Sequence, residues 1–472
     1  MKQRSAQGKI NFAALGIWIL AILAYIIAIA NRSSFSVLGS TAQHHFGVEA
    51  TLLSVFLVAQ IAVYTCMQVP VGVMVDRYGA TKMICSGLFI MSMGQLLMAH
   101  ADSVVLGFAA RMLVGVGDAS IFVSMLRIVA DWFPPKIVPI ISQISALSAQ
   151  SGQFISIVPL AAVVSGYGWS VGFTALAVVT LLVLAFCLIW LRDSTMHTSI
   201  TGKIFRRKRT IPMSVVTAVT QGAQVWDSPI GKIAPPTEAV PVLGADGMGV
   251  FRAIKFLLSR PGIRLGFWIH FGSASGMHCF LLLWGSAFVT GGQGRTASEA
   301  ALVLGATLIS SVIGGICVGY LQVRFMRRRI IIALGYIIVF ALVWSVVLLW
   351  QGGPAPMWML IILACLVGWG GPMAMFGFDI ARTHIDPKQI GIATGLTNTG
   401  AFVGALLMIL GIGLLLDLQG AGSPDTYTQG AFNVAMSWYV AVLLFSVVMV
   451  LWEYPRAKRQ LVKRMRALQG DD

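Results

Sequence analysis

The chain has 472 residues, of which 57% are hydrophobic and only 11% are charged. A soluble domain carries roughly 25% charged residues, so this composition excludes a soluble protein and indicates one that lies in a membrane. The net charge of +16 does not indicate a nucleic-acid partner. Lys and Arg cluster between apolar runs, as the positive-inside rule requires of cytoplasmic loops. We therefore expect a multi-pass protein of the inner (plasma) membrane, embedded in the lipid bilayer.

Twelve apolar segments are long enough to span a bilayer. They cover about 12–40, 51–75, 83–100, 104–130, 137–164, 171–191, 264–290, 298–322, 330–350, 356–378, 390–415 and 431–452. With twelve spans, the outer loops contain one Lys or Arg, Arg295, and nearly all the others fall in inner loops and tails. The sequence thus predicts an all-α membrane protein of twelve helices with both termini cytoplasmic.

The first span is interrupted by Asn31, Arg32, Ser33 and Ser34. The helix could end there and leave Arg32 in an outer loop. We prefer to continue it, because an apolar stretch follows and the other outer loops avoid basic residues.

Residues 192–260 break the pattern of spans with a basic cluster at 203–209 and a Pro- and Gly-containing stretch. We interpret them as a cytoplasmic linker whose basic run lies near anionic headgroups. Its segment 250–258 is amphipathic and is expected at the membrane surface. The domains are then an N-terminal six-helix half (1–191), the linker (192–260), a C-terminal six-helix half (261–455) and a basic cytoplasmic tail (456–472). We expect a monomer.

The six cysteines lie singly within predicted spans, and no CxxC pair occurs. We therefore expect no metal site and no cofactor. No nucleophile–base pair or phosphate-binding loop is visible either, so an enzyme is not expected.

Two charges mark the fourth span. Arg111 and Asp118 are seven residues apart, which places both on one face of a helix. A charge near the bilayer centre costs about 2.5–3.5 kcal/mol even on the most lenient scale, and intramembrane charges are functional by default. The alternative is a structural ion pair that orients the helices.

A motif recurs in the two halves. Gly72 is followed after three residues by Asp76 and Arg77, and Gly319 after three residues by Val323 and Arg324, 247 residues later. Each copy follows the second span of its half. Duplicated six-span halves are the plan of many secondary transporters, with the binding site between the halves.

The stretch from Gly72 to Lys82 resembles the signature of the major facilitator superfamily in the loop between spans 2 and 3, G-x-x-x-D-R-x-G-x-[RK]-[RK]. Only Lys82 represents the two basic residues at its end. The resemblance implies the superfamily's fold and a gating or structural role at the cytoplasmic junction for Gly72, Asp76, Arg77, Gly79 and Lys82. The second copy lacks the acid, so any such latch is asymmetric.

A narrower resemblance is to the anion:cation symporters, which include carriers of sugar acids. It rests on Arg32, on Arg111 and Asp118, and on the sequence AspTrpPhePro at 131–134. In that branch the first arginine meets the substrate carboxylate and the acid of span 4 carries the coupling proton. This chain has Asp118 where the branch usually has Glu, and Asn31 where many members have an acid, which puts a two-proton stoichiometry in doubt.

Arg32 keeps its charge at any physiological pH, and its planar fork suits a carboxylate. It could equally pair with helix-end carbonyls or with Asp118. Further substrate contacts are expected from polar or aromatic side chains in other spans: Arg111, Tyr64, Gln150, His278, Trp284 and Asn398. Each has a structural alternative: Tyr64, within the polar stripe Gln60, Tyr64 and Gln68, could hydrogen-bond between helices, and Trp284 could face lipid. Asp379 and Arg382 are expected to form a cytoplasmic gate pair.

The sequence therefore predicts a secondary active transporter that takes up a small organic anion with protons by alternating access. Arg32 and Arg111 would hold the anion, and Asp118 the proton. The alternative is a proton-coupled antiporter that exports a drug or metabolite. The glycine series ending in Gly-Pro-x-x-Gly-Gly, which marks span 5 of drug–proton antiporters, is not present.

Overall fold

The computed structural model describes residues 12–47, 50–193, 250–385, 389–421 and 426–469. Its first group of helices is α1 (Phe12–Val37), α2 (Gly39–Phe46), α3 (Ala50–Tyr78), α4 (Ala80–Ala99), α5 (Val104–Trp132), α6 (Val138–Leu147), α7 (Ala149–Ile155), η1 (Ser156–Leu160), α8 (Ala161–Tyr167) and α9 (Trp169–Trp190). The second is α12 (Val250–Leu258), α13 (Pro261–Cys279), η3 (Phe280–Trp284), α14 (Gly285–Ala287), η4 (Phe288–Gly292), α15 (Ala297–Arg324), η5 (Met326–Arg328), α16 (Arg329–Leu348), α17 (Met357–Thr383), α18 (Ile390–Leu418) and α19 (Gln429–Gln469).

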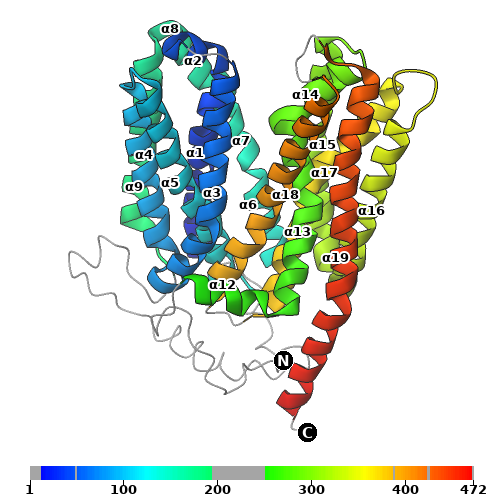
Figure 1. The fold of residues 1–472 in the computed structure, drawn as a ribbon. Helices are drawn as coiled ribbons and strands as arrows, with labels where there is room; N and C mark the ends of the chain where they lie inside the picture. Colours follow the sequence, from blue (N-terminus) through cyan, green and yellow to red (C-terminus); the bar gives the residue numbers. More distant parts are fainter. Residues whose placement is uncertain (1–11, 48–49, 194–249, 386–388, 422–425, 470–472) are drawn as a thin grey trace.

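These helices form two bundles that lie side by side, one of α1 to α9 and one of α13 to α19 (Figure 1). Each has its own apolar core, the C-terminal one built around fully buried aromatic residues such as Phe340 and Trp344. Helix ends follow the sequence: the Ser103 hydroxyl accepts a bond from the Leu106 N–H at the start of α5, and Thr296 and Glu299 form a capping box at α15. The predicted all-α fold in two six-helix halves is confirmed.

Within the described residues, eleven helices are long and apolar enough to cross a membrane. The predicted fifth span is the missing one, because it is broken into α6, α7, the π-helix η1 and α8. Figure 1 shows α6, α7 and α8 following one another along the bundle. Pro159 lies inside η1, where the wider turn accommodates its missing N–H. Twelve segments were therefore correctly predicted, but one of them is not a continuous helix.

Two further boundaries answer questions that the sequence left open. Helix α1 continues through Arg32 to Val37, so this arginine lies within the helix as preferred above. Helix α19 extends to Gln469, well past the end predicted at 452.

The amphipathic segment 250–258 is a helix, α12, and buries Leu257 in a cluster with Val69 and Ile263. Residues 194–249, which hold the predicted basic linker, lie outside the described residues.

Candidate functional site

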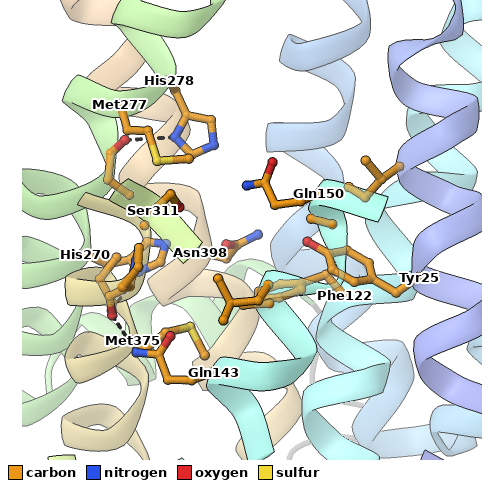
Figure 2. Close-up of a pocket in the computed structure, with 18 of the residues that line it drawn as sticks. Tyr25, Phe122, Gln143, Gln150, His270, Met277, His278, Ser311, Met375 and Asn398 are labelled. Atoms are coloured by element: carbon orange, nitrogen blue, oxygen red, sulfur yellow. Dashed lines mark hydrogen bonds between the residues drawn. The ribbon is translucent and has the colours of Figure 1, made fainter. Parts of the chain in front are cut away.

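A cavity of about 160 Å³ lies between the two bundles, and both line it. In Figure 2, Tyr25, Phe122 and Gln150 face it from the N-terminal bundle, and His270, His278 and Asn398 from the C-terminal one. Among the described residues that line it, Arg32 is the one with a fixed charge. Because a position between the halves is typical of transporter binding sites, the cavity is the candidate substrate site.

Arg32 joins the cavity to a buried acid. Its Nε donates to Asp118 Oδ2 at 2.5 Å, from α1 to α5. The Asp118 side chain is 1% exposed, whereas that of Arg32 is 27% exposed, so the arginine lies between the acid and the cavity. Arg32 Nη2 and Asp118 Oδ1 have no hydrogen-bond partner within the described part of the chain. The ion pair therefore leaves one buried donor of the arginine and one buried oxygen of the acid without a hydrogen bond to any described residue.

Tyr64, an expected substrate contact, lies beside this pair and lines the cavity. The Arg32 guanidinium lies 4.5 Å from the centre of the Tyr64 ring, a cation–π distance. The Tyr64 hydroxyl accepts a bond from Asn398 Nδ2 at 3.2 Å, and Gln68 Oε1 accepts a second one at 2.8 Å. Tyr64 thus lines the cavity, and both Tyr64 and Gln68 bond to the other half.

Arg111, an expected substrate ligand, does not lie at the cavity. It is 1% exposed and is not among the residues that line the cavity. Its Nη2 donates to Gln60 Oε1 at 2.6 Å and to the Arg32 carbonyl at 2.9 Å. Helical spacing alone suggested Arg111 and Asp118 as a pair, but the acid's ion-pair partner is Arg32. In this conformation, Arg111 stabilises the backbone of α1 behind the site.

Trp284 is also away from the cavity. Its indole N–H donates to the Ile409 carbonyl at 3.0 Å, and its ring packs near Phe432. This side chain therefore joins α18 and α19 to the π-helix η3 and does not stack on a substrate in this conformation. Gln150 and His278, also expected from the sequence to contact substrate, do line the cavity.

The cavity also contains residues that sequence analysis did not single out as substrate ligands: Tyr25, Phe122, Gln143, Gln153 and His270. Aromatic residues in an apolar span give no signal, since most of them pack in a core. The sequence could have indicated Gln143 as a cavity residue, because it lies seven residues before Gln150 and on the same face of the helix.

The signature acid Asp76 lies at the junction of the two halves. Its carboxylate accepts bonds from the backbone N–H groups of Gly391 and Ile392, both at 2.8 Å, at the start of α18. Arg127 pairs with the same carboxylate at 3.0 Å. An acid at a helix N-terminus satisfies free N–H groups and complements the helix dipole. This geometry fits the latch that the resemblance implied.

The other signature residues differ in their surroundings. A Cβ on Gly72 would lie 2.6 Å from Ile392 Cα, so this glycine lets α3 and α18 touch. Gly79 has φ +92°, a conformation that favours glycine, and the next helix begins with Thr81 N–H donating to Asp193 Oδ1 at 2.7 Å. Arg77 and Lys82 are exposed.

Asp379 and Arg382, expected from the sequence to form a gate pair, lie within ion-pair distance of each other. Arg382 Nη1 lies 3.5 Å from Asp379 Oδ1 and donates to the Ser142 hydroxyl of α6 at 3.4 Å. The pair therefore connects α17 to the N-terminal bundle, beside a stronger bond from Gln143 Nε2 to the Pro372 carbonyl at 2.8 Å.

Two six-helix bundles around a central cavity, joined by the contacts of Gly72 and Asp76 with α18, define a secondary transporter fold. Residues 21–349 match the Major Facilitator Superfamily, and the chain belongs to this family. It is a transporter and a multi-pass membrane protein.

Curated relatives cover nearly the whole chain. A probable galactarate/D-glucarate transporter, GudP of Bacillus subtilis (strain 168), is 21% identical over 95% of this chain and 94% of its own length. GudP of Pseudomonas putida is 24% identical over 89% and 88%. The D-galactonate transporter of Escherichia coli O6:H1 is 22% identical over 90% and 94%. Their named substrates are sugar acids, and the resemblance to the anion:cation symporter branch is confirmed.

A solved structure shows the same fold. The proton:xylose symporter XylE, bound to 6-bromo-6-deoxy-D-glucose, superposes with a TM-score of 0.68 and covers 95% of this chain and 97% of its own. Its sequence identity is 13%, so this likeness concerns the fold alone.

Proposed function

We propose that this protein takes up a sugar acid together with protons across the inner (plasma) membrane, with both termini in the cytoplasm. The observation that carries the proposal is the Arg32–Asp118 pair, in which an arginine at the cavity shares its charge with a buried acid. The named substrates of the relatives support an anion of this class.

The mechanism follows from competition for one guanidinium. While Asp118 is ionised, its carboxylate neutralises the charge of Arg32 from the side away from the cavity. When Asp118 takes up a proton, the arginine is released to bind a carboxylate, which a planar guanidinium recognises with two parallel bonds. Substrate and proton therefore bind together. Loss of the substrate restores the ion pair and favours release of the proton, which couples the two in both directions.

Alternating access requires that one end of the cavity closes while the other opens. In this conformation, hydrogen bonds between the halves gather from the cavity level to the end that holds α12: Asn398 to Tyr64, Gln143 to Pro372, and Gly391 to Asp76. This closed end would be the cytoplasmic one, because it holds the signature loop. The alternative of a drug exporter is less favoured, since a lipophilic cation would meet the charge of Arg32.

Uptake into proteoliposomes tests the proposal. We expect a panel of radiolabelled sugar acids to include one that accumulates when the outside is acidic. Arg32→Ala should lower affinity by about 10- to 100-fold, because a hydrogen bond to a charged group contributes about 1.5–3 kcal/mol. Arg459→Ala, which removes an exposed arginine outside the cavity and both motif copies, is the matched control and should transport normally.

The coupling role needs a second variant. Asp118→Asn should abolish uphill accumulation but retain exchange of internal for external substrate, because the site still binds the anion. Accumulation that persists in Asp118→Asn would contradict the role of this acid, and no uptake of any sugar acid by the unmodified protein would contradict the proposal as a whole.

A further inference from the structure

The two ends of the cavity differ in the hydrogen bonds that they can offer. On the N-terminal side of the cavity, the Arg32 guanidinium, the Tyr25 hydroxyl and the amides of Gln150 and Gln153 can all donate. This end suits one carboxylate. The C-terminal bundle opposite provides no fixed positive charge among its described lining residues.

Two histidines on that opposite wall have a defined tautomer. His278 Nδ1 lies 2.8 Å from the Ala274 carbonyl, and His270 Nδ1 lies 3.0 Å from the Ala374 carbonyl. A carbonyl oxygen can only accept, so Nδ1 carries the hydrogen in each ring. In a neutral imidazole the remaining nitrogen, Nε2, is then an acceptor. The imidazole of His278 lies at the cavity in Figure 2.

Two amides reinforce this character. Asn398 donates both bonds of its Nδ2 group, to Tyr64 and to Gln68, and its remaining polar atom is a carbonyl oxygen. The Asn398 side chain also interacts with that of His270. Gln143 donates to the Pro372 carbonyl, and its Oε1 is buried without a partner in the described part of the chain. Acceptors of this kind bind hydroxyl groups, which donate, and they repel a carboxylate.

We infer that the site selects polyhydroxy acids with a single carboxylate over the dicarboxylates of the same skeleton, with the carboxylate at Arg32 and the hydroxyl chain toward His278, Asn398 and Gln143. This inference rests on the proposed function and names its substrate class. A second carboxylate would face acceptor atoms with no cation to pair with, and unpaired charge in a cavity is costly. In the proposed mechanism, a single substrate carboxylate replaces the single carboxylate of Asp118 as the partner of Arg32.

The test uses two matched pairs of ligands, D-gluconate with D-glucarate and D-galactonate with D-galactarate. The members of each pair differ only at the terminal carbon, which is a hydroxymethyl group in one and a carboxylate in the other. Affinities are measured by thermal-shift titration of the purified full chain at pH 7.5, where a histidine with an ordinary pKa is neutral. We expect the monocarboxylate to bind at least about ten-fold more tightly in the pair that the stereochemistry of the site accepts.

A charge placed on the acceptor wall provides the second arm. His278→Lys should bring the ratio of the two affinities to near unity or reverse it, and His100→Lys, which changes an exposed histidine, should leave the ratio unchanged. Equal or tighter binding of the dicarboxylate by the unmodified protein would overturn the inference while leaving sugar-acid transport intact. An unchanged ratio in His278→Lys would overturn the acceptor wall, and no binding of either member of either pair would overturn both proposals.

Discussion

The two junctions between the halves occupy equivalent places but are closed by different chemistry. At the α3–α18 junction, Asp76 accepts two N–H groups of α18 and pairs with Arg127. At the α6–α15 junction, Val323 stands in place of the acid and is 38% exposed. The nearest polar contact there, between Gln143 Nε2 and Gln322 Oε1, is long at 3.4 Å. One junction is thus a charged cap, and the other a looser contact of neutral groups.

The partner helix explains why the acid is missing from the second copy. Gly72 touches Ile392, and Gly319 lies nearest to Gln143 and Ile140. The residue before Ile392 is Gly391, whose N–H bonds Asp76, whereas the residue before Ile140 is Pro139, which has no N–H. An acid at 323 would therefore find a poorer partner. The second junction lacks both the acid and the N–H group that would bind it, so the charged cap belongs to the N-terminal motif alone.

Removing the acid should have the largest effect. Asp76→Asn loses the charge that the N–H groups of Gly391 and Ile392 bind, and we expect the closed junction to be destabilised by about 3 kcal/mol. Hydrogen exchange of the first turn of α18 should become correspondingly faster. Asp131→Asn is the control, because Asp131 also pairs with Arg127 but is 30% exposed and does not bond α18. Unchanged exchange in Asp76→Asn would show that the cap is not a latch.

A matched pair of glycine variants compares the two junctions directly. In Gly72→Ala the new methyl group would lie 2.6 Å from Ile392 Cα, which is backbone and must move. We expect a loss of about 1–3 kcal/mol in thermal denaturation, as for other overpacked sites. In Gly319→Ala the nearest atom, Gln143 Cγ, is 3.6 Å away, so stability should be unchanged or slightly higher. Equal effects of the two variants would contradict the asymmetry.

The neutral junction should respond more weakly. Gln143→Leu removes the donor to the Pro372 carbonyl, and we expect a loss of about 1 kcal/mol in thermal stability. Gln153→Leu, which also changes a glutamine at the cavity, is the comparison. A loss as large as that of Asp76→Asn would mean that the amide junction is as strong as the charged one.

The smallest effect is expected from restoring the acid. Val323→Asp places a carboxylate opposite a helix that begins with Pro139, so it should change stability by less than about 0.5 kcal/mol. Hydrogen exchange at the start of α6 should also remain as it was. Strong new protection there would show that the second copy lacks a latch only for want of the acid.

The sequence predicted the fold through features that act locally. Apolar length, the placement of basic residues and the repeated motif are each determined within one stretch of chain, and the twelve-segment plan followed from them. The breaks in the fifth span were missed, because Pro159 lies in a π-helix whose position depends on packing against α1. Pro159 itself signals a disturbed helix, but no sequence pattern shows that the disturbance is a π-helix or that α6 ends at Leu147.

The site was predicted in part, and the errors have one cause. Helical spacing relates residues on one helix, so it favoured Arg111 as the partner of Asp118, and the pairing of Arg32 with Asp118 was considered only as an alternative. The observed partner, Arg32, is 86 residues away on α1. Arg111 and Trp284 were predicted to contact the substrate because a charged or aromatic side chain within a span is a candidate ligand. Their observed hydrogen-bond partners, Gln60 and the Ile409 carbonyl, are on other helices. Tertiary contact, which spacing cannot reveal, decided each role.

The central claim is that Asp118 and the substrate compete for Arg32, and binding by Asp118→Asn tests it most directly. Affinity for the preferred sugar acid would be measured by thermal-shift titration at pH 5.5 and 7.5, for the unmodified protein and for the variant. We predict that Asp118→Asn at pH 7.5 binds at least as tightly as the unmodified protein at pH 5.5, with the pH dependence greatly reduced, because the arginine is no longer neutralised. Any contribution of His270 and His278 is common to both proteins. Weaker binding by Asp118→Asn at both pH values, or an unchanged pH dependence, would contradict the claim.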